Sequence, residues 1–205
     1  MNRTSLESLQ EIYRNIVEIS YRIAEHIADQ SRALADDDVF EDTPYPRCSI
    51  RTHNVAGKVV YQLFYDGALP LYFDKDPKLK SKAADIGRYQ SQIRDSYVRA
   101  TADAVRSLGT KPEPFERSFL YICHFFGNLV IRDLDNRNRS CIINAVRYAG
   151  LIRGDEWERL EIMESGFLDP EGKFYVVVFV APMEIGWEVV NCVKQMYRNG
   201  YRFRI

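Results

Sequence analysis

Residues 119–139 read FLYICHFFGNLVIRDLDNRNR, an apolar run of strand length that passes into a segment of acidic and basic side chains. A helical pattern follows over residues 138–148 and ends near Gly150. An apolar strand, a charged turn and a helix in this order are typical of a sheet covered by helices. The stretch therefore predicts an α/β or α+β fold, with a small mixed sheet and helices packed on it.

The rest of the chain supplies further strands and helices. Runs rich in β-branched and aromatic residues predict strands, whereas apolar residues at three- and four-residue steps predict helices. The expected strands are 59–65, 69–73 (weakened by Pro70), 159–167 and 174–180, the last of them central and buried on both faces. The expected helices are 83–108, which Gly109 would end, and 184–197.

The N-terminal region divides from the rest by composition. Residues 1–35 carry an apolar stripe that predicts one amphipathic helix, either docked on its own domain or pairing with a second subunit. Residues 36–47 are rich in acidic residues and proline and predict a linker. Residues 48–205 would then form the main domain, including the C-terminal helix.

Composition limits the class of protein. The chain has 205 residues, of which 46% are hydrophobic and 28% charged, as expected for a folded globular protein. Its four cysteines are widely scattered, so we expect reduced thiols in a cytoplasmic protein and neither a zinc site nor a disulfide framework. We expect no signal peptide and no membrane span, since every apolar run is too short for a bilayer.

Basic residues gather in one part of the chain. The formal net charge is −1, yet residues 75–139 hold 13 Lys and Arg against 8 Asp and Glu. Such an excess is either a solvated helix face or a surface that binds phosphates. On the second interpretation, DNA backbone contacts would come from the basic loop that carries Lys75, Lys78, Lys80 and Lys82.

Asp133 and Asp135 are candidate metal ligands. Two residues apart on extended backbone, they would point to the same face and repel each other unless a cation lay between them. Magnesium accepts one or two carboxylates together with phosphate oxygens. Asp155 could complete the site if the chain turns back, and neighbouring arginines could hold phosphates: Arg132, Arg137 and Arg139. The plainer interpretation is a solvated charged turn in which Asp135 or Asn136 caps the next helix.

The segment from Phe119 to Phe179 resembles the catalytic half of the RusA-like Holliday junction resolvases. The resemblance rests, in order, on Cys123-His124, Arg132-Asp133-Leu134-Asp135-Asn136, Tyr148-Ala149-Gly150-Leu151-Ile152, Asp155-Glu156, the turn 169–173 and the apolar strand after it. It implies a homodimeric, magnesium-dependent endonuclease that cleaves four-way DNA junctions in DNA recombination and repair. It also implies that Asp133, Asp135 and Asp155 bind magnesium and that Arg139 stabilises charge on the phosphate.

The chain departs from that family at named positions. Arg139 stands where the family carries a lysine, and arginine does not readily transfer a proton. Gly154 precedes Asp155 where the family usually has two aspartates, so Glu156 is an alternative third ligand. These changes favour a second hypothesis, a catalytically impaired DNA-binding or assembly protein such as one of a mobile element. A helical interaction protein without a nucleic-acid role is a third.

Other candidate residues point to ordinary packing. We expect His124 to be a satisfied core or edge residue, Cys141 a buried helix cysteine, and Trp157 and Trp187 packing residues. No glycine-rich phosphate loop of the GxGxxG or GKS/GKT type is present. A nucleotide-dependent motor and a dinucleotide enzyme are therefore not expected.

Overall fold

The computed structural model describes residues 46–70, 83–129, 134 and 137–204, with the backbone alone for 83–90 and 92. All of them belong to one compact unit, Pro46–Ile205. The predicted helix 1–35 and most of the linker 36–47 lie outside the described residues, so the predicted domain boundaries stay predictions. Several predicted site residues also lie outside the described residues: Asp133, Asp135, Arg132, Lys75, Lys78, Lys80 and Lys82.

A five-stranded mixed sheet forms the centre of the described unit, in the order β1-β2-β5-β3-β4. Only β3 and β4 pair in parallel, and the other neighbours are antiparallel. The strands are β1 Cys48–Val55, β2 Lys58–Asp66, β3 Ser118–Phe126, β4 Leu160–Leu168 and β5 Tyr175–Pro182. All eight residues of β5 are buried, which confirms the central strand predicted from its continuous apolar run.

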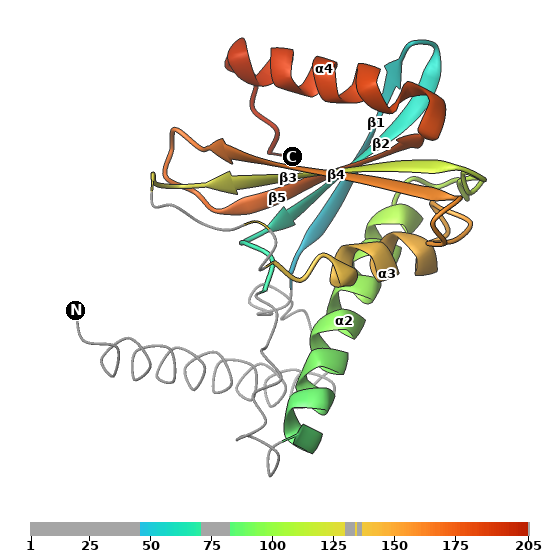
Figure 1. Cartoon of the computed structure of the whole chain (residues 1–205), viewed down its shortest axis with the longest axis vertical. Coiled ribbons are helices and arrows are strands. Elements are labelled where there is room, and N and C mark those ends of the chain that lie inside the picture. The colour runs from blue at the N-terminus through green and yellow to red at the C-terminus, as the bar shows by residue number, and fades with distance from the viewer. Residues whose placement is uncertain (1–45, 71–82, 130–133, 135–136, 205) are drawn as a thin grey trace. The chain divides into compact units, whose positions relative to one another are not determined.

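Helices cover both faces of the sheet (Figure 1), and this confirms the predicted mixed fold of strands and helices. The α4 helix lies on one face, and α2 and α3 lie on the other. The helices are α2 Ala83–Arg106, α3 Ser140–Tyr148 and α4 Gly186–Arg198, the last preceded by the short 3₁₀ helix η2 Met183–Ile185.

The main hydrophobic core lies between α4 and the sheet. Alternate residues of β3 and β5 face this helix, as the two-residue period of a strand requires. Val189, Val190 and Val193 of α4 pack against them, and Phe203 from the chain end adds a buried aromatic ring. The start of α4 sits close to β3, because a Cβ at Gly186 would lie only 2.5 Å from the Phe119 ring.

The opposite face packs against α2 through a buried polar contact as well as apolar ones. The Tyr65 hydroxyl of β2 is 2.7 Å from the Thr101 hydroxyl of α2, and the Tyr65 and Tyr97 rings are 5.5 Å apart. Ile93, Tyr97 and Ala104 are buried, as their places on the predicted apolar stripe of this helix require.

The strand β1 was not expected from the sequence. It pairs with the whole of β2 through a two-residue turn, in which Ala56 and Gly57 have φ of +50° and +76°. Positive φ at both central residues is the geometry of a type I′ hairpin turn. Alanine seldom takes it, so the Ala-Gly pair is a weak turn signal. The described part of the predicted strand 69–73, Leu69-Pro70, is not a strand.

The predicted cap of α3 is wrong. The helix begins at Ser140 with Arg139 at the N-cap position, the Arg139 side chain makes no capping hydrogen bond, and the first turn holds no acidic residue. Asp135 and Asn136 therefore stand too early in the chain to cap this helix.

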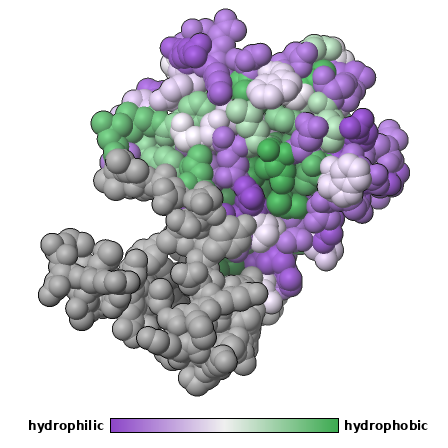
Figure 2. Space-filling model, in the orientation of Figure 1, coloured by the Kyte–Doolittle hydropathy of each residue, from purple (hydrophilic) through white to green (hydrophobic). Residues whose placement is uncertain are grey.

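Figure 2 shows hydrophobic side chains interrupted by hydrophilic ones over the visible face of the described unit. Among the helices that the structure describes, none is long and apolar enough to cross a membrane.

Candidate functional site

The candidate site lies where the parallel strands β3 and β4 end. A crossover through α3 joins them, and such a crossover brings the carboxyl ends of both strands to one edge of the sheet. Leu134, which stands between Asp133 and Asp135 in the sequence, lies beside Gly166 of β4, with 3.9 Å from its Cδ2 atom to a Cβ built there. Leu134 is therefore the one residue of the predicted acidic pair's segment, 133–135, that the structure describes at this edge.

His124 and Glu164 share the face of the sheet at this edge. Glu164 pairs in register with Ile122, two residues before His124. The His124 Nε2 atom is 3.9 Å from Glu164 Oε2 and makes no hydrogen bond within the described part of the chain. Burial, and to a smaller extent the nearby charge of Arg137, lower the pKa of His124 to about 4, so the imidazole is neutral at pH 7. The residue is buried as predicted, but its Nε2 atom is not satisfied by any of the described residues.

Arg139 reaches across the edge to Glu164. Its Nη1 atom is 3.3 Å from Glu164 Oε1, and its side chain is half-exposed whereas the glutamate is nearly buried. The predicted phosphate ligand thus has a carboxylate partner, and a phosphate would have to compete with Glu164 for it. Sequence reasoning missed Glu164, although an acidic residue within a predicted strand was a signal for it.

Arg137 and Asn138 connect this edge to the end of β2. The Arg137 guanidinium donates a 2.8 Å hydrogen bond to the carbonyl oxygen of Leu69, and it lies 6.0 Å from the centre of the Phe126 ring. The backbone N–H of Asn138 donates a 2.7 Å hydrogen bond to the carbonyl oxygen of Pro70. Pro70, the last described residue before the predicted basic loop, therefore lies against the start of the crossover.

Asp155 lies in the connection from α3 to β4, close to where both strands begin. Ile152 forms a bridge with Phe115, just before β3. The Asp155 carboxylate accepts a 2.9 Å hydrogen bond from Arg147 of α3. Leu134, by contrast, lies beside Gly166, six residues after the first residue of β4 and so roughly 20 Å along the strand.

The three predicted metal ligands are not all described, so their convergence stays a prediction. Within the described ranges no three His, Cys, Asp or Glu side chains come together as a metal site. A magnesium ion that bound Asp155 would have to compete with Arg147, whose Nη1 atom lies 2.9 Å from the Asp155 carboxylate. The alternative ligand, Glu156, has a mostly exposed carboxylate 3.8 Å from Arg159. A side chain at Gly154 would collide with this carboxylate, so the glycine leaves room for it.

No protein-family model matches the chain, and no curated protein matches it either.

Proposed function

We propose that the chain is a magnesium-dependent endonuclease of the RusA-like type, acting on branched DNA such as a four-way junction. The observation that carries the proposal is the hydrogen bond from Asn138 to Pro70. It holds Pro70, which stands five residues before Lys75 in the sequence, against Asn138, which stands between Arg137 and Arg139. A basic, partly exposed edge next to predicted carboxylates is suited to a scissile phosphate.

The arginines would bind and orient the DNA backbone. Arg139 is half-exposed, so it is free to exchange its contact with Glu164 for a phosphate oxygen. Arg137 is fixed by its hydrogen bond to Leu69 and would hold its charge in place. A magnesium ion held by Asp133 and Asp135 would polarise the phosphate and lower the pKa of an attacking water.

A homodimer would suit this substrate. Two subunits related by a two-fold axis place two sites on a symmetric junction. The predicted helix 1–35 is our candidate for the dimer contact.

A cleavage assay with a labelled four-way junction tests the proposal. We expect magnesium-dependent cleavage by the wild-type chain, loss of cleavage with bound DNA retained in Asp133→Asn and Asp135→Asn, and weaker binding in Arg139→Ala. Glu188→Gln, an exposed change on α4 at the other face of the sheet, is the matched control and should cleave normally. Cleavage by Asp135→Asn at the wild-type rate would refute the assigned site.

A second candidate is a RusA-like DNA-binding or assembly protein with impaired catalysis. The 2.9 Å pair between Arg147 and Asp155 favours it, because it engages the predicted third ligand. On this hypothesis the wild-type chain and Asp135→Asn would bind junctions equally well and both be inert with magnesium.

A further inference from the structure

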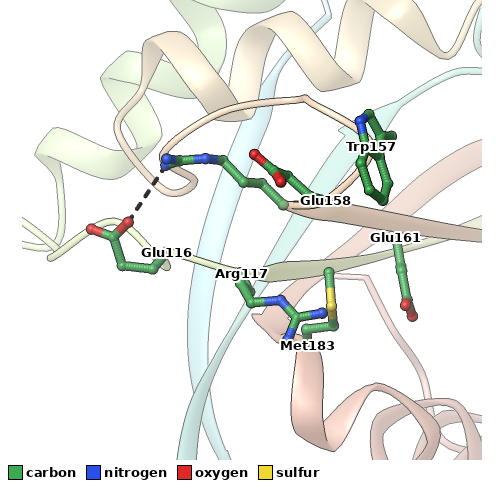
Figure 3. Close-up of a pocket in the computed structure, with 7 residues that line it drawn as sticks. Glu116, Arg117, Trp157, Glu158, Glu161 and Met183 are labelled. Carbon is green, nitrogen blue, oxygen red and sulfur yellow. Dashed lines mark ion pairs between the residues drawn. The ribbon is translucent and has the colours of Figure 1, made fainter.

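A pocket of about 610 Å³ opens where β3 and β4 begin, at the opposite end of these strands from the candidate site (Figure 3). Its walls come from three places in the sequence. They are the residues before β3, the connection into β4 with the start of that strand, and Met183 of η2. The pocket is thus independent of the proposed nuclease site.

Trp157 stands at this pocket with 88% of its surface exposed. The prediction that it packs in the interior is wrong, and the same holds for Trp187, which is 67% exposed. A tryptophan left in water forgoes one of the largest gains that a side chain obtains from burial. Tryptophan is also the residue most enriched at the energetic centres of protein interfaces. Trp157 therefore marks the pocket as a contact surface.

The charges on one wall are already paired. Glu116 lies 2.7 Å from Arg153 and 3.5 Å from Arg159, and Figure 3 draws the second pair. The hydrogen bond from Arg153 lowers the pKa of Glu116 more than its slight desolvation raises it. Arg159 also lies 3.8 Å from Glu156. This network holds the wall in place and leaves little of its charge for a ligand.

Two carboxylates beside Trp157 lack such partners. Glu158 and Glu161 are exposed and take part in no ion pair within the described ranges. The seven residues that line the pocket include three acidic and two basic ones, so its lining is acidic on balance. A surface of this sign repels a DNA backbone and attracts a cationic side chain, which also gains from the face of an indole ring.

The outer strand beside the pocket, β4, is an edge strand of the sheet that the described residues form. No strand of the described unit pairs with the outer side of β4, to which Glu161 belongs. Its outward N–H and C=O groups form a template on which an extended peptide can add as a further strand. Arg117, on the wall across from Trp157, has no ion-pair partner in the described part of the chain. It disfavours a uniformly cationic ligand and suits a peptide that also carries a carboxylate.

We propose that this pocket binds an extended segment of a partner protein, with a lysine or arginine placed against Trp157 between Glu158 and Glu161. The backbone of the segment pairs with the edge of β4, and an acidic side chain close to the basic one meets Arg117. The function of the site is partner recognition, and it does not require the chain to cleave DNA.

Fluorescence of Trp157 tests the proposal directly. The full chain with Trp187→Phe keeps Trp157 as its sole tryptophan, and the probe is the blocked peptide Thr-Lys-Thr-Glu-Thr. We expect a saturable change in emission, and binding about fivefold or more weaker with Glu158→Gln and Glu161→Gln combined. Isothermal titration compares Trp157→Ala with the matched control Trp187→Ala in the native background. Only the first should lose binding, by about tenfold, and neither should lower the melting temperature because both side chains are exposed.

Four results would overturn the proposal. The first is equal binding of the peptide Thr-Glu-Thr-Glu-Thr, in which glutamate replaces the lysine, and the second is wild-type affinity in Trp157→Ala. The third is preferential binding of a five-nucleotide thymidine oligomer, which would make the pocket a nucleic-acid contact. The fourth is a change of oligomeric state on Trp157→Ala in sedimentation, which would assign the surface to a second copy of the chain. Junction cleavage by Trp157→Ala should stay normal, so the two proposals fail separately.

Discussion

Glu164 holds Arg139 at the carboxyl ends of β3 and β4, with 3.3 Å between carboxylate and guanidinium. The pair sets the charge of the candidate site in the absence of DNA. A phosphate oxygen that takes the Nη1 donor of Arg139 displaces this glutamate, and Glu164 is then left beside the neutral ring of His124.

Glu164→Gln should strengthen binding to a four-way junction. The change removes a competing carboxylate and frees the charge of Arg139, so we expect affinity to rise by about two- to fivefold, since a partly exposed ion pair is worth at most about 1 kcal/mol. The slope of log affinity against log salt concentration should steepen by the amount expected for about one additional phosphate contact. Fluorescence anisotropy over a salt series measures both quantities, with Glu188→Gln as the control. Unchanged affinity would mean that Arg139 does not contact the DNA.

The free energy of unfolding should fall as the pH drops from 7 to 5. The pKa of His124 is about 4 in the folded protein, against 6.5 for an ordinary histidine. The unfolded chain therefore binds more protons between these values, and stability is lost as the pH falls through this window. The loss from this residue is about 2 kcal/mol between pH 7 and pH 5. Urea unfolding at several pH values measures it.

His124→Asn is the matched variant for this effect. It should reduce the slope of stability against pH in that window, whatever it does to stability at pH 7. The same slope in the variant and the wild-type chain would assign the pH dependence to other groups.

Gly186→Ala should destabilise the protein, although alanine is the better helix former. The added methyl group would stand 2.5 Å from the Phe119 ring, so α4 or the ring must shift. We expect a loss of about 1–3 kcal/mol, as for an overpacked core. Thermal unfolding measures it, with the exposed neighbour change Glu188→Ala as the control. A more stable Gly186→Ala variant would show that α4 does not approach β3 so closely.

Arg147 and Asp155 should show a small coupling energy. Both side chains are more than a third exposed, so screening by water limits the pair to about 0.2–1 kcal/mol. A double-mutant cycle of Arg147→Met and Asp155→Asn in urea measures the coupling. If magnesium stabilises Arg147→Met more than the wild-type chain, Asp155 becomes a metal ligand when it is released. Equal stabilisation of the variant and the wild-type chain by magnesium would indicate that Asp155 does not bind the ion and that Asp133 and Asp135 are its only predicted ligands.

The strands and helices that carry long apolar patterns were predictable from the sequence. The runs at β2, β3 and β5 and the stripe of α2 are local signals, and each of these elements appears close to its predicted bounds. The strand β1 was missed because its residues alternate weakly and its register is set by pairing with β2. Local patterns hold no information on such a partner.

Most contacts of the candidate site could not be predicted from the sequence. Glu164 lies near His124 only because β3 and β4 pair in parallel after a crossover of more than thirty residues. The pairing of Asp155 with Arg147 likewise depends on where α3 ends. Large apolar residues are expected to be buried, and Trp157 is exposed instead. Exposed residues of this kind are often found at contact surfaces.

The central place of β5 has a consequence for synthesis of the protein. This strand lies between β2 and β3 but is the last of the five in the chain, so the sheet cannot close until residue 182 has been made. Until then the ribosome presents β2 and β3 with apolar, unpaired edges. Such edges invite association with other chains. We therefore expect the nascent protein to depend on chaperones more than its size suggests, and truncation before β5 to yield aggregates.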